Sequence, residues 1–151
     1  MALFDLPLER LRSYLPEPTT PEDFDEFWDS TLAAARAHEV IVSVEPVDTG
    51  LRLVETFDVT FAGFDGQPVR AWFSRPAGAD GPLPTVVEYL GYGRGRGLPG
   101  ERLTFPAAGY AHLLMDSRGQ GGQWGSGGDT SDPVGSGPAS PGFVTRGILD
   151  P

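Results

Sequence analysis

The sequence predicts an α/β fold, with a helical segment first, then a β-hairpin, then a parallel strand–helix–strand unit. Three observations indicate this class. Apolar residues recur at helical spacing within residues 1–40, alternate along residues 51–73, and then form two short runs about twenty residues apart. Two strands joined by a crossover of this length pair as a right-handed parallel unit.

The composition limits the possible functions. A chain of 151 residues with 39% hydrophobic residues fits one domain with one core. The formal net charge of −10 disfavours nucleic acid and anionic membranes as partners. The absence of cysteine removes thiolate nucleophiles and Cys-based metal sites. No run is long enough for a membrane span and the first residues do not resemble a signal peptide, so we expect a cytoplasmic protein.

The first predicted element is a helix over residues 21–38. Thr20 suits the N-cap and Pro21 suits the first helical position. The apolar positions then fall on one face, which is rich in aromatic residues. We expect this face to pack into the core; it consists of Phe24, Phe27, Trp28, Thr31, Leu32 and Ala35.

A hairpin is predicted next. Residues 51–64 alternate as a half-buried strand does, with Leu51 and Leu53 at its start. Asp65-Gly66 is a turn dipeptide, after which residues 69–73 resume the alternation. Two long antiparallel strands follow from this pattern.

The parallel unit is predicted from residues 85–90 and 111–115, with a short helix at 101–108 between them. Residues 90–97, LGYGRGRG, directly follow the first of these strands. Open α/β sheets bind ligands at the carboxyl ends of parallel strands. Glycines here allow a close approach to the backbone by a nucleotide phosphate, an anionic substrate or the oxyanion of an ester under attack.

The phosphate alternative is the weaker one. Residues 95–100 match G-x-G-x-x-G literally, but Pro99 removes a donor where the fingerprint needs N–H groups at a helix start. Asp116 is not placed to bind a ribose. We therefore expect no dinucleotide, no other cofactor and no metal.

The oxyanion alternative is better supported. In α/β-hydrolases one oxyanion donor is a backbone N–H from the loop after the third strand. Tyr92, which follows Gly91, occupies that position, and its ring would line the pocket for a small acyl group.

The chain resembles the acetyl xylan esterase and cephalosporin C deacetylase family of α/β-hydrolases, specifically the N-terminal half of such proteins. The matching stretches cover most of the chain: FDLPL at 4–8, DFDEFW at 23–28, FDVTF at 57–61, Gly91-Tyr92, Arg96-Gly97, Met115-Asp116, RGQG at 118–121, PGF at 141–143 and TRGILDP at 145–151.

The resemblance implies a serine-type hydrolase that removes acetyl groups from small acetylated sugars, xylo-oligosaccharides and cephalosporin C-like esters. It also implies a cytoplasmic homo-oligomer, a hexamer in the complete family. Tyr92 would give its backbone N–H to the oxyanion hole and contact the substrate. The loop departs from the family at Gly93-Arg94, and Arg94 adds a charge whose effect is open.

The nucleophile and base are not in this chain. No serine from Ser13 to Ser140 lies in a G-x-S-x-G elbow. The two histidines are expected to be structural, with His38 on the surface and His112 in the core or at an interface. Without a serine and base the chain alone is predicted to be inactive.

We therefore predict that residues 1–151 form an incomplete α/β-hydrolase domain. Residues 1–40 would be a helical N-terminal segment, and 41–151 the first half of the sheet with a Gly/Pro-rich loop at 117–142. The alternative is a non-catalytic hydrolase half that acts only in assembly. Weaker alternatives are a metalloenzyme and a carbohydrate-binding domain, which would use Trp28, Trp72 and Trp124. Of these, we expect Trp28 and Trp72 to pack against the core.

Asp116 and Arg118 have two interpretations. They brace the end of the sheet by charge-assisted hydrogen bonds, with the neighbouring glycines making the turn, or Arg118 contacts substrate. The first interpretation is favoured.

Overall fold

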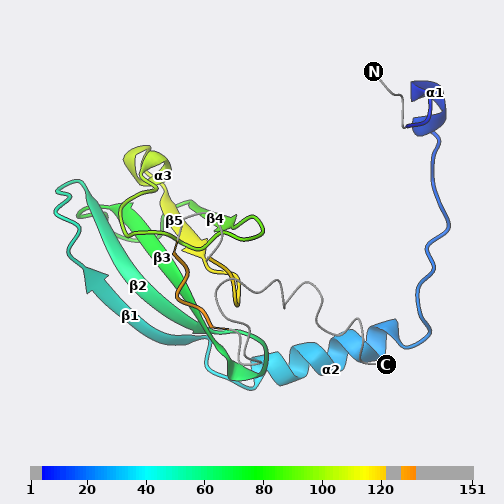
Figure 1. Ribbon diagram of the computed structural model, residues 1–151, viewed down its shortest axis with the longest axis horizontal. Helices are drawn as coiled ribbons and strands as arrows, with labels where there is room; N and C mark the ends of the chain where they lie inside the picture. The colour runs from blue at the N-terminus through cyan, green and yellow to red at the C-terminus, as the bar shows by residue number, and fades with distance from the viewer. Residues whose placement is uncertain (1–4, 122–126, 132–151) are drawn as a thin grey trace. The chain divides into compact units, whose positions relative to one another are not determined.

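The computed structural model describes residues 5–121 and 127–131 (Figure 1). The chain divides into two units, Met1–Leu32 and Ala33–Pro151, which are described separately. Most of the predicted loop at 117–142, including Trp124, lies outside the described residues. No helix in the described part of the chain is long and apolar enough to cross a membrane.

The first unit contains α1 (Leu8–Leu11) and most of α2 (Phe24–Arg36). The helix predicted at 21–38 is thus confirmed with a later start, at Phe24. Its aromatic face was predicted to pack into the core; within this unit Phe24, Phe27 and Trp28 are 45–57% exposed. The Trp28 ring stacks edge-on against both phenylalanines. Helical spacing predicts an apolar face, but it does not specify what covers that face.

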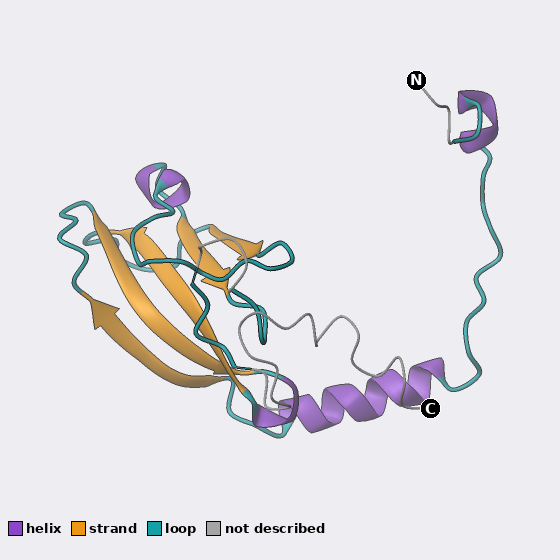
Figure 2. Cartoon of the chain, viewed as in Figure 1, coloured by secondary structure: helices purple, strands orange, loops and turns teal. Residues whose placement is uncertain are grey.

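The second unit is built on one five-stranded sheet (Figure 2). The strand order is β1-β2-β3-β5-β4. Sequence analysis did not predict the first strand, which pairs antiparallel with β2. The strands are β1 (Ile41–Val47), β2 (Val54–Ala62), β3 (Pro68–Pro76), β4 (Thr85–Tyr89) and β5 (Ala111–Met115).

The predicted hairpin is formed by β2 and β3, which pair antiparallel along their whole length. Its turn contains a 3₁₀ segment in which Asp65 and Gly66 both have positive φ, as the dipeptide predicts. The strand begins later than predicted, so Leu51 and Leu53 lie before β2 and are 40% and 83% exposed. Gly50 has a φ of +71°, and the pairing with β3 starts at Val54.

The parallel unit is confirmed. β4 pairs parallel with β5 from Thr85–Ala111 to Tyr89–Met115, and α3 (Thr104–Ala107) lies in the crossover. β5 also pairs antiparallel with β3 and therefore occupies an interior position in the sheet, whereas β4 ends the sheet of the described residues. The predicted fold class is confirmed: the structure is mixed α/β, with a five-stranded sheet and few helices.

The core lies on the interior strands. Ala71 of β3 and Ala111 and Leu114 of β5 are at most 2% exposed. His112 is equally buried, and its Nε2 lies 3.1 Å from Glu88 Oε2 on the neighbouring strand. The prediction of a core histidine is thereby confirmed, as is that of a surface position for His38, whose side chain is 41% exposed.

Candidate active-site loop

The loop after β4 begins with a tight turn at the carboxyl end of a parallel strand. The Arg94 N–H donates to the Gly91 carbonyl over 3.1 Å, and Gly93 has a φ of +78°. Tyr92 is not among the residues with positive φ. These are the features of a type II turn, with Tyr92 and Gly93 at its two central positions. Tyr92 is 49% exposed.

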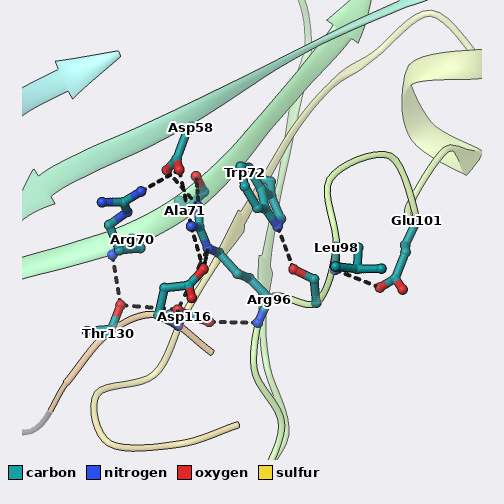
Figure 3. Close-up of polar contacts among 11 residues, drawn as sticks. Asp58, Arg70, Ala71, Trp72, Arg96, Leu98, Glu101, Asp116 and Thr130 are labelled. Atoms are coloured by element: carbon teal, nitrogen blue, oxygen red, sulfur yellow. Dashed lines mark hydrogen bonds and ion pairs between the residues drawn. The ribbon is translucent and has the colours of Figure 1, made fainter. Parts of the chain in front are cut away.

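The second part of the loop is held by a buried carboxylate. Asp116 follows β5 directly and is 1% exposed. Its Oδ1 accepts from the Arg96 N–H at 2.6 Å. Its Oδ2 accepts from the Asp129 N–H at 2.7 Å and from the Thr130 hydroxyl at 3.2 Å (Figure 3). A single side chain therefore joins the loops that follow β4 and β5 to residues 129–130.

The Arg96 side chain is 1% exposed, and its guanidinium group forms several hydrogen bonds and ion pairs. Its Nη1 donates to Asp58 Oδ1 at 2.8 Å and to the Ala71 carbonyl at 3.0 Å, and its Nη2 donates to Asp129 Oδ2 at 2.7 Å. The guanidinium carbon lies 3.6 Å from the centre of the Trp72 ring, a cation–π contact. A buried arginine is tolerated only when ion pairs and hydrogen bonds compensate its charge.

The ion pairs outweigh the cost of burial. Burial alone would raise the pKa of Asp58, but the hydrogen bonds and charges of Arg96 and Arg70 lower it below its ordinary value of 3.8. Burial likewise acts to lower the pKa of Arg96, and Asp58 and Asp129 raise it above its ordinary value instead. Asp58 and Arg96 are therefore both charged at neutral pH.

Two glycines of the loop, Gly95 and Gly97, contact the backbone of another segment of the chain. A Cβ on Gly95 would lie 2.2 Å from the Gly127 carbonyl oxygen. The Gly97 N–H donates to the same oxygen at 2.9 Å. Sequence analysis considered only ligands as the reason for glycine here. For Gly95 the close neighbour is another loop of the same chain, which the second glycine pair at 127–128 could have indicated.

The turn after β5 supports the first part of the loop. Gln120 Oε1 accepts a hydrogen bond from the Gly93 N–H. Arg118 donates from Nη1 to Gln67 Oε1, in the loop between β2 and β3. Asp116 and Arg118 thus both brace this end of the sheet, as the favoured interpretation predicts, although Asp116 does so mainly through backbone N–H groups.

The structure brings some predicted residues together and separates others. Tyr92 and Asp116 belong to adjoining loops, whereas His112 is buried against Glu88, and His38 lies 3.9 Å from Asp65 at the hairpin turn. Sequence analysis missed Asp58. Asp58 falls at a polar position in the alternation of β2, between Phe57 and Val59, so the pattern alone did not mark it as a partner of Arg96.

The weaker alternatives gain little support from the described residues. Residues 5–121 and 127–131 contain no group of three or more His, Asp or Glu side chains that could hold a metal ion. Trp72 is occupied by Arg96 on its ring and donates from Nε1 to the Gly97 carbonyl at 3.0 Å. Trp72, which was predicted to pack against the core, is half-buried, and Trp28 is 46% exposed.

Comparison with known proteins identifies the family. A family model described as acetyl xylan esterase (AXE1) matches residues 1–151. The acetyl xylan esterase from Paenibacillus sp. R4 is 38% identical with a TM-score of 0.71, and the match covers 86% of this chain and 40% of that protein. Acetyl xylan esterase 1 from Thermoanaerobacterium sp. JW/SL YS485 is 32% identical with a TM-score of 0.76, covering 97% and 44%. This chain thus spans less than half the length of both relatives, and it belongs to the acetyl xylan esterase family.

Proposed function

We propose that this chain supplies the oxyanion-hole loop of a serine-type carboxylic ester hydrolase that removes acetyl groups. The observation that carries the proposal is the type II turn at Gly91–Arg94, which places Tyr92 beyond the carboxyl end of β4. The buried carboxylate of Asp116 and the Gln120 side chain fasten this loop on both sides of Arg94. A loop fixed in this way suits a donor that must keep its direction during a reaction.

The chemistry assigned to Tyr92 is electrostatic. When a serine attacks an acetyl carbonyl, negative charge collects on the carbonyl oxygen. A backbone N–H that already faces this oxygen stabilises the transition state without reorganisation, and one such donor contributes about 2.7–4 kcal/mol. Tyr92 would supply this N–H, and its ring would border the space for the methyl group of the acetyl.

The attacking serine and its base would come from outside residues 1–151. No serine in this sequence stands in a G-x-S-x-G elbow. The oxyanion loop and the nucleophile would therefore meet only when this chain is combined with the remainder of a hydrolase domain. The incomplete domain predicted for residues 1–151 remains part of this proposal.

Family membership supports acetylated xylo-oligosaccharides and other small acetylated sugars as substrates. Both structural relatives are acetyl xylan esterases. We extend the proposal to cephalosporin C-like esters, to a cytoplasmic location and to a homo-oligomer, a hexamer in the complete enzyme. No cofactor is required for this chemistry.

A complementation assay tests the proposal. The chain is mixed with the part of the Paenibacillus sp. R4 relative that it does not cover, and release of acetate from acetylated xylo-oligosaccharides is measured. We expect hydrolysis only in the mixture, and none with either part alone. A matched mixture in which the relative's nucleophilic serine is replaced by alanine is the control.

The competing candidate is a hydrolase half that serves only in assembly. The exposed side chains of the terminal strand β4, Val87 at 45% and Tyr89 at 75%, favour an association role for that edge. Association of the two parts in sedimentation without any acetate release would support this candidate and contradict the catalytic one.

A further inference from the structure

Gln120 links the turn after β5 to the turn that carries Tyr92. Its Oε1 accepts the Gly93 N–H. Because the donor is an N–H and only the amide oxygen of glutamine accepts, this contact fixes which way the Gln120 amide faces. One side chain thus holds the peptide group that directly follows Tyr92.

The backbone that carries Gln120 is itself firmly held. The Gln120 N–H donates to the Ser117 carbonyl at 3.2 Å, and the Gly119 N–H donates to the Thr130 carbonyl at 2.9 Å. A Cβ on Gly128 would lie 2.4 Å from the Gln120 carbonyl oxygen, so these two segments are in close contact. Thr130 is 5% exposed and donates to Asp116. The Gln120 side chain therefore extends from a fixed base.

The contact selects one of two turn geometries. Type I and type II turns differ mainly in the direction of their central peptide, here the one joining Tyr92 to Gly93. Gln120 accepts from the N–H of that peptide, so it stabilises the direction seen here. Without this acceptor the central peptide is free to rotate toward the type I geometry, which reverses the Tyr92 carbonyl and the Gly93 N–H and changes the backbone on the C-terminal side of Tyr92.

We propose that Gln120 is a positioning residue that holds the turn carrying Tyr92 in its type II geometry. The inference deepens the proposed function and rests on it, since Tyr92 is the assigned donor. Asp116 has a different part, because it binds the Arg96 N–H in the buried half of the loop. Gln120 acts beside Tyr92, where a small misplacement of a donor lowers the rate while the fold persists.

Selective isotope labelling can observe this contact without any activity. The dipeptide Tyr-Gly occurs once in the sequence, at Tyr92–Gly93, so carbonyl-labelled Tyr with nitrogen-labelled Gly gives one NMR signal, from the Gly93 amide. Gly-Tyr occurs twice, at Gly91–Tyr92 and Gly109–Tyr110, so the reverse labelling reports on the Tyr92 amide. The Tyr110 N–H donates to the Phe105 carbonyl at 3.1 Å and serves as an internal reference.

Two variants of similar size separate the acceptor from the volume of the side chain. Gln120→Met removes the acceptor, so we expect the Gly93 amide to exchange about tenfold faster or more and both the Gly93 and Tyr92 signals to shift. Gln120→Glu keeps an acceptor oxygen and should leave the Gly93 amide protected. The Tyr110 signal should stay in place in both. Unchanged Gly93 and Tyr92 signals in Gln120→Met would overturn the inference.

Kinetics of the complemented enzyme then test the positioning role. We expect Gln120→Met to lower kcat on the order of 10- to 100-fold with little change in KM or melting temperature. If Gln120→Met keeps full kcat while Tyr92→Pro, which deletes the amide, is inactive, the positioning role is refuted and the donor assignment stands. If Tyr92→Pro is fully active, the donor assignment fails, and the NMR result still decides whether Gln120 holds the turn.

Discussion

The two halves of the loop after β4 are built in opposite ways. Gly91–Arg94 forms an open turn, in which Tyr92 is 49% exposed and a Cβ on Gly91 would meet nothing within 4 Å. At residues 95–97, which directly follow this turn, Gly95 has no room for a Cβ and Arg96 is 2% exposed. A buried ionic anchor thus supports an exposed turn. In the first half, glycine allows the turn that exposes Tyr92. In the second half, it allows two backbone segments to pack closely.

This difference predicts that substitutions in the second half affect stability and those in the first half affect the reaction. The buried half places Asp58, Arg96 and Asp116 in one cluster, where each charge is matched by others. Removing one partner from such a cluster leaves a buried charge without compensation. The exposed half carries no comparable cost.

The largest loss of stability is expected from Arg96→Met. This change leaves Asp129 without its guanidinium and Asp58 with Arg70 as its remaining partner, and we expect the free energy of unfolding to fall by about 3–5 kcal/mol. The matched control is Arg94→Met in the exposed half, for which about 0.5 kcal/mol or less is expected. Urea unfolding of both variants measures the difference, and equal losses would contradict the contrast between the halves.

A smaller loss is expected from Gly95→Ala. The added methyl group would meet the Gly127 carbonyl oxygen at 2.2 Å, so the two loops must separate. We expect a cost of about 1–3 kcal/mol. Gly91→Ala, which meets nothing within 4 Å, should be nearly neutral in the same thermal melts. A stable Gly95→Ala protein with an unchanged melting temperature would show that the contact with Gly127 is not formed.

The smallest effect is expected from acid. The pKa of Asp58 is lowered from 3.8, so its ion pairs contribute stability that is fully present above this ordinary value and is lost as pH falls through the lowered one. Asp58→Asn should remove this part of the decline in unfolding free energy between pH 5 and the acid limit.

Glu55 provides the comparison for this prediction. Its pKa is also lowered, first by its hydrogen bond from Arg75, but its side chain is 39% exposed. Glu55→Gln should flatten the acid profile less than Asp58→Asn, because solvent screens an exposed pair. A larger effect from Glu55→Gln would indicate that Asp58 is not paired in the folded protein.

Periodicity predicted the sheet better than it predicted burial. The alternation in β2 and β3 and the two short runs of β4 and β5 led to the observed pairings, because strand pairing follows local patterns and crossover length. Helical spacing also predicted the aromatic face of α2, but it does not specify what covers that face, because this depends on parts far away in the sequence.

Only part of the candidate site could be predicted from the sequence. Tyr92 could be named because it follows a glycine at the end of a strand, and Asp116 because it follows the next strand. Asp58 and Asp129 could not be assigned to Arg96, because they are 38 and 33 residues away in the sequence and come close to it only in the folded chain. Gln120 belongs to the RGQG stretch at 118–121, but its contact with Gly93 depends on the geometry of two turns.

The most direct test of the assigned oxyanion donor compares Tyr92→Pro with Tyr92→Ala in the complemented enzyme. Proline suits the first central position of a type II turn and lacks the N–H, whereas alanine keeps the N–H and removes the ring. We predict that Tyr92→Pro lowers kcat for acetyl ester hydrolysis about 100- to 1,000-fold relative to Tyr92→Ala, at equal melting temperatures. Equal kcat values for the two variants would contradict the assignment of the Tyr92 amide as the donor.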